Sequence, residues 1–203
     1  MTGVGAGLRA RPRCPRGPEN MTKQELIARL RTNADDAVTK LRTVPDNAWQ
    51  QGRYENGWNA RQILAHVASI EWTYPRLIDL AKQPPEVQPT SLQQATSAAP
   101  QQHAAGAPQS AQAAGSARMT GGVNSYNDRQ VEKRADASLA DLIAEFEKNR
   151  AATIAAVEAA DEPLFDAPIR SAGGISGTLS DVMNAIAIEH VRGHVADILG
   201  AKN

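Results

Sequence analysis

Cysteine is almost absent from the 203-residue chain. Because Cys14 is the only one, neither an intrachain disulfide nor a metal site built on cysteine can form. No apolar run approaches the roughly 20 residues that a transmembrane helix needs. Residues 1–20 contain Arg and Pro but no apolar core of a signal peptide. These absences predict a cytoplasmic protein that does not enter a membrane.

Aromatic residues and an excess of charge of either sign are also lacking. Aromatics make up 4% of the chain, and Val or Ile rarely alternate with polar residues, which favours helix over strand. The 22 basic and 22 acidic residues balance, and four of the basic ones but only one acidic one lie in residues 1–20. The remaining chain is therefore mildly acidic, which argues against nucleic acid as a partner.

Apolar residues recur every three to four positions in four segments, a pattern that predicts an all-α four-helix bundle. The first helix is expected over 22–44, starting with the capping pair Thr22 and Glu25. The second is expected to start after Asn59 and to run past Leu77, with a kink at Pro75.

The second half of the chain repeats the pattern after a short helical stretch near residues 127–134. Ser138 and Asp141 predict the start of a third helix that ends near Asp161. A loop rich in Gly and Pro follows. Thr178 is then expected to cap a continuous fourth helix that ends at Gly200.

Two segments lack any apolar periodicity. Residues 1–20 are expected to form a disordered N-terminal extension, and residues 84–122, rich in Ala, Gln and Pro, a disordered insertion. The expected bundle therefore consists of residues 21–83 and 123–200. The composition of 84–122 favours a linker over a lid on the site.

Three of the four histidines fall on predicted buried helix faces, and the fourth, His103, lies in the expected insertion. His66 lies within the apolar arc of the second helix, and His190 and His194 share the inner face of the fourth. One inward histidine is most often a structural residue with its nitrogens hydrogen-bonded. Three of them on facing helices favour a metal site.

Such a site would leave a coordination position open for water or substrate, as catalytic sites do. Ligation by nitrogen alone suits zinc, nickel, iron or copper better than magnesium or calcium. Asp197 shares the inner face and could orient an imidazole, or it could be a solvated residue near the helix end. Trp58 could line a pocket or belong to the core. The sequence contains no GxSxG, Walker or GxGxxG motif.

Three runs, GWNARQILAHVASIE, YNDRQVEKR and IEHVRGHVADIL, together resemble the DinB-like superfamily. The resemblance lies near the branch related to mycothiol-dependent maleylpyruvate isomerase and covers residues 21–83 and 123–200. It implies a divalent metal bound by His66, His190 and His194. The isomerase branch has glutamate at the position of His190, whereas other DinB-like proteins have histidine there.

The residues and the resemblance together lead us to expect a metal-dependent enzyme. The ion would activate a low-molecular-weight thiol for transfer to, or isomerisation of, a small electrophilic substrate. Two alternatives stay open: a hydrolase in which the metal activates water, and a non-catalytic protein that stores or senses a metal or small ligand. The expected partner is a small molecule, and the sequence leaves a homodimer open.

Overall fold

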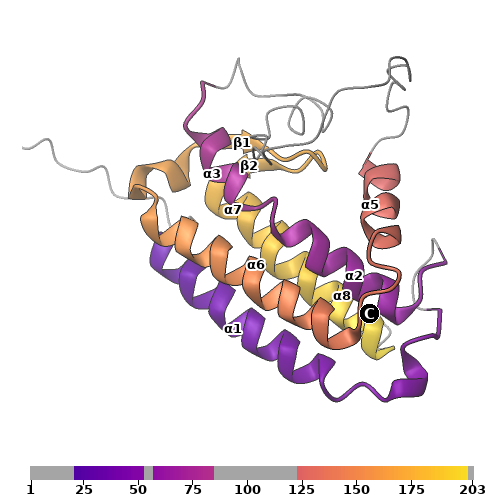
Figure 1. The fold of residues 1–203 in the computed structure, drawn as a ribbon. Coiled ribbons are helices and arrows are strands. Elements are labelled where there is room, and N and C mark those ends of the chain that lie inside the picture. The colour runs from indigo at the N-terminus through magenta and orange to yellow at the C-terminus, as the bar shows by residue number, and fades with distance from the viewer. Residues whose placement is uncertain (1–20, 53–56, 85–122, 201–203) are drawn as a thin grey trace, which may run out of the picture.

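Four helical segments surround a common core in the computed structural model, which describes residues 21–52, 57–84 and 123–200 (Figure 1). Helix α6 packs against both α1 and α2, and α8 packs against the same two helices, so that the order around the core is α1, α6, α2, α8. The prediction of an all-α four-helix bundle is confirmed. The expected extension over 1–20, and the expected insertion from residue 85 on, lie outside the described residues. The bundle helices are α1 (Lys23–Leu41), α2 (Ala60–Glu71), α6 (Leu139–Ala159) and α8 (His190–Leu199).

The predicted helix starts are present because side chains satisfy the free backbone N–H groups of the first turn. Thr22, Asn59 and Ser138 each cap a helix, and in all three the residue three positions later hydrogen-bonds back to the cap. The Thr178 side chain accepts a hydrogen bond from the backbone of residue 181. Gly200, with φ 69°, ends α8 in the left-handed conformation that glycine adopts without strain.

The second predicted helix is two helices, so the expectation of one kinked helix is wrong. Helix α2 ends at Glu71, and α3 (Pro75–Ala81) begins at Pro75. Proline has no backbone N–H and its ring clashes with the preceding turn, so it is tolerated at the first position of a helix but not inside one. Helix α5 (Val123–Glu132) begins earlier than the stretch expected near 127–134.

The loop expected after the third helix contains short regular elements. A 3-10 turn η3 (Glu162–Asp166) leads into strand β1 (Pro168–Arg170), which pairs antiparallel with β2 (Ser176–Thr178). Gly174, with φ 88°, takes the turn between them. The hairpin closes one end of the bundle beside α3 (Figure 1). A second 3-10 turn, η1 (Asp46–Ala48), follows α1.

The fourth helix is not continuous α-helix as expected. It consists of α7 (Leu179–Met183), a π turn η4 (Asn184–Glu189) and α8. At about 100° per residue, an unbroken α-helix would turn the buried face of α8 roughly 90° away from that of α7. The extra residue of a π turn shifts the following residues by about 100° and so offsets this difference. Both halves of the helix therefore face the same core.

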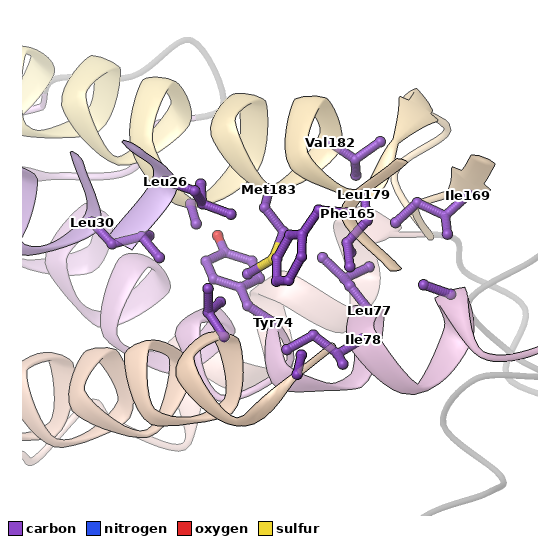
Figure 2. Packing of buried hydrophobic residues seen from close by; sticks show 14 of the residues in the cluster. Leu26, Leu30, Tyr74, Leu77, Ile78, Phe165, Ile169, Leu179, Val182 and Met183 are labelled. Atoms are coloured by element: carbon purple, nitrogen blue, oxygen red, sulfur yellow. The ribbon is translucent and has the colours of Figure 1, made fainter. Parts of the chain in front are cut away.

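The core divides into three hydrophobic clusters along the bundle. One end is closed by α3, η3, the hairpin and α7, where Phe165 and Met183 pack against Tyr74 (Figure 2). The middle cluster centres on Phe146, and the far cluster gathers around Trp49 and the start of α2. Among the described residues, no helix combines the length and apolar character needed to cross a membrane.

Candidate metal centre

The structure brings His66, His190 and His194 together between α2 and α8. Each offers one nitrogen to a group in which all three nitrogen atoms lie within 4.8 Å of one another. His66 and His194 are 3% and 4% exposed, and His190 is half-buried. The histidines that the sequence predicted to face inward therefore form a single cluster.

Local structure fixes where each imidazole lies. His66 follows three fully buried residues of α2, and its position along the bundle is set by the Asn59 cap at the start of that helix. His190 and His194 stand at the first and fifth positions of α8, one turn apart on the same side. Their direction depends on the π turn, because η4 ends at the residue before His190.

The second nitrogen of each α8 histidine has an oxygen partner. Nδ1 of His194 lies 3.2 Å from Oδ2 of Asp197, and the backbone carbonyl of Ile186 accepts a hydrogen bond from the His190 ring. A carbonyl or carboxylate oxygen can only accept, so these ring nitrogens carry the protons. Since Nε2 of His190 faces His194, we assign its proton to Nδ1.

Nε2 of His190 and Nε2 of His194 are consequently both lone-pair atoms, and they lie 2.9 Å apart. Two lone pairs at this distance repel each other unless a cation is shared between them. At the metal–nitrogen length of about 2.0–2.1 Å, two ligands at a right angle lie roughly 2.9 Å apart. The donor pair therefore fits one transition-metal ion.

A proton is a poor candidate for the shared cation, because burial disfavours charged imidazole. Burial and the neighbouring His194 and His190 lower the pKa of His66 to about 3. Burial and His194 lower the pKa of His190 to about 4, against the opposing effect of the Ile186 carbonyl. Burial also lowers the pKa of His194, although Asp197 opposes it. Burial thus favours the uncharged form of all three rings, which is the form that can bind a metal.

His66 adds a third nitrogen donor from the neighbouring helix α2. Its ring is perpendicular to those of His190 and His194, with centroids 5.5 Å and 5.1 Å away. Its Nδ1 is buried and has no hydrogen-bond partner in the described part of the chain. An unsatisfied buried nitrogen is costly, and metal ligation would satisfy one of the nitrogens of this ring.

Trp58 joins the histidine cluster to a cavity. Its ring centroid lies 5.1 Å from that of His66, and it packs against the far hydrophobic cluster. It also lines a cavity of about 560 Å³ between the start of α2 and α5, whose wall includes Gln62, Asp128 and Glu132. Both sequence interpretations of this tryptophan, pocket wall and core residue, therefore apply.

The architecture and the histidine cluster agree with one family. Residues 26–198 match the model of the DinB superfamily. The chain belongs to the DinB superfamily. No curated protein and no solved structure is significantly similar to it. Membership does not distinguish the isomerase branch from the rest of the superfamily.

This DinB-superfamily chain also contains a buried ion pair that the sequence analysis did not identify. Arg150 of α6 and Glu71 of α2 are 1% and 0% exposed. Nε and Nη2 of Arg150 lie 2.8 Å and 3.0 Å from the two carboxylate oxygens of Glu71. The spacing of Phe146, Arg150 and Val157 on the buried face of α6 was a signal that could have found it.

The lowered pKa of His66 predicts how the stability of the metal-free protein depends on pH. Below its ordinary pKa near 6.5 the unfolded chain binds a proton at His66, whereas the folded chain does not until about pH 3. Stability is therefore lost as the pH falls from 6.5 towards 3. Between pH 6.5 and 5, wild type should lose roughly 1–2 kcal/mol more unfolding free energy than His66→Leu.

Urea unfolding of chelator-treated protein at several pH values measures this difference. Comparing the two proteins cancels the opposite contribution of Glu71, whose pKa burial raises to about 7 while Arg150 opposes the rise. Parallel pH dependences for wild type and His66→Leu would contradict the prediction.

Proposed function

We propose that the chain is a metal-dependent enzyme in which His66, His190 and His194 hold one divalent transition-metal ion. The observation that supports this most is the pair of Nε2 atoms, 2.9 Å apart, whose lone pairs face each other. The third histidine lies on the neighbouring helix α2, and its nitrogen lies within 4.8 Å of those of the other two. Imidazole donors suit zinc, nickel, iron or copper better than magnesium or calcium.

The protein residues around the ion would orient its ligands. Asp197 fixes the proton of His194 on Nδ1, and the Ile186 carbonyl does the same for His190, so that Nε2 of each ring would be the metal donor. The buried surroundings of His66 exclude water from one side. A bound divalent ion would lower the pKa of a thiol or water at its open position and so supply a nucleophile at neutral pH.

Catalysis is supported over metal storage or sensing by the ligand count and by the cavity. Within the described residues the histidine cluster has three members, which leaves a coordination position for a ligand from solution. Trp58 contacts His66 and lines the cavity of about 560 Å³, so a small molecule bound there would be close to the ligand cluster. We place the substrate on this side.

We infer that the nucleophile is a low-molecular-weight thiol and the second substrate a small electrophile. The cavity wall contains amide and carboxylate side chains, which suit a polar thiol with hydrogen-bonding groups. The chain then contributes position and ligand orientation, while the reacting sulfur arrives with the substrate. Hydrolysis by water activated at the same position is the competing reaction.

Metal binding gives the first test of this proposal. Wild type should bind close to one zinc ion per chain, and His190→Ala or His194→Ala should weaken binding by at least 10- to 100-fold, because each removes a ligand. Isothermal titration of chelator-treated protein measures both. His103→Ala, the same substitution at the fourth histidine, is the matched control and should bind like wild type. No zinc uptake by wild type would refute the proposal.

Thiol transfer is the second test. Zinc-loaded protein should accelerate the reaction of mycothiol, glutathione or cysteine with 1-chloro-2,4-dinitrobenzene, in which the thiol loses its proton, a carbon–sulfur bond forms and chloride leaves. His66→Ala should abolish the acceleration while the helical circular dichroism signal remains. Activity towards 4-nitrophenyl acetate alone, without thiol, would assign the chain as a hydrolase instead. Absence of both activities in the loaded protein would favour the storage or sensing function.

A further inference from the structure

Side chains from three other helical segments hold the π turn η4 by its carbonyl groups. Tyr74 donates its hydroxyl to the Ile186 carbonyl at 2.8 Å, and Nη2 of Arg150 donates to the Ala187 carbonyl at 2.6 Å. Nδ2 of Asn33 lies 3.4 Å from the next carbonyl, that of residue 188. Three consecutive carbonyls thus bond to side chains from outside the helix. Such bonds compensate the distorted backbone of a π turn.

The two stronger donors are themselves rigidly placed. Arg150 is fixed by its two contacts with the Glu71 carboxylate in the core. Tyr74 is 4% exposed, and its ring packs between Leu26 and Met183 (Figure 2). A buried side chain with packed neighbours has few alternative rotamers. The carbonyls of η4 are therefore held against a fixed frame that includes α2, α3 and α6.

The carbonyl oxygen of Ile186 connects this frame to the histidine cluster. The Ile186 carbonyl that accepts from Tyr74 also accepts from the ring of His190. The backbone N–H of His190 donates to Ala185, five residues earlier, which is the hydrogen bond that defines the π turn. The direction of the His190 ring thus follows the position of η4, and the turn sets the rotation of α8 as a whole.

We propose that Tyr74 and the Arg150–Glu71 pair are positioning residues of the metal centre, which hold η4 so that Nε2 of His190 faces Nε2 of His194. This inference rests on the proposed metal site. Groups that orient ligands in this way change metal affinity by about 10- to 100-fold when they are removed. The effect should appear in the affinity and geometry of the bound ion and not only in stability.

Tyr74→Phe is the mildest test, because it removes one hydroxyl and leaves the packed ring. Its zinc affinity should fall by about 10-fold or more, and the ligand-field absorption spectrum of the cobalt-substituted protein should shift. The matched control is Tyr126→Phe, which removes a hydroxyl from α5, a helix that packs against α2. The control should keep the affinity and the spectrum of wild type.

A paired substitution tests whether the Arg150 guanidinium contributes to metal binding. Replacing Arg150→Met and Glu71→Leu together avoids leaving one charge buried alone, a change that is often neutral for stability. It removes the hydrogen bond to the Ala187 carbonyl, and zinc affinity should fall by about 10- to 100-fold. Arg134→Met with Glu145→Leu is the matched control, since that ion pair joins the start of α6 to the residues after α5.

The outcomes separate the two proposals. Wild type that binds no zinc would overturn the metal site and the positioning inference together. Wild type that binds zinc while Tyr74→Phe and the folded paired variant keep its affinity and cobalt spectrum would overturn the positioning inference alone. If the paired variant does not fold, as judged by circular dichroism, Tyr74→Phe decides the inference.

Discussion

The site depends on which nitrogen of each α8 imidazole carries the proton. Asp197 and the Ile186 carbonyl each accept a hydrogen bond from the ring nitrogen that they face, and the other nitrogens, Nε2 of His194 and Nε2 of His190, lie 2.9 Å apart. Burial keeps the rings neutral, so a proton is poorly suited to relieve the repulsion between their lone pairs. A bound metal ion would satisfy both nitrogens at once. The proposed metal site would in this way connect the packing of the bundle with its chemistry.

Two groups of buried ionisable side chains lie among the apolar clusters of the described bundle. One is the histidine cluster, and the other is the Arg150–Glu71 pair with the hydroxyl of Tyr74. Charges and imidazoles lose hydration when they are buried, and ion pairs of this kind contribute little net stability. The apolar clusters on either side must carry the stability of the fold. The buried polar side chains instead determine which side chains and backbone carbonyls lie in contact.

The parts of the fold that depend on local sequence could be predicted. Thr22, Asn59 and Ser138 mark helix starts because a capping side chain acts within three residues of itself. The inward direction of His66 and His194 follows from apolar spacing over a few helical turns. The resemblance to the DinB superfamily is confirmed over residues 26–198.

The parts that depend on distant contacts could not be predicted. The π turn has no local signature, since its carbonyls are held by Tyr74 and Arg150 from more than 30 positions away in the chain. The sequence could have suggested it through the mismatch between the buried faces of 179–183 and 190–199. The hairpin over 168–178 was missed because its strands have only three residues each and carry little pattern.

X-ray absorption spectroscopy of the metal-loaded chain tests the central claim most directly, because it reports the atoms bound to the ion. A zinc-edge spectrum should show nitrogen or oxygen neighbours at about 2.0–2.1 Å with the outer-shell scattering of three imidazole rings. His66→Ala should reduce that outer-shell scattering by about one ring in three. A first shell of oxygen atoms without imidazole scattering would contradict the assignment of His66, His190 and His194 as the ligands.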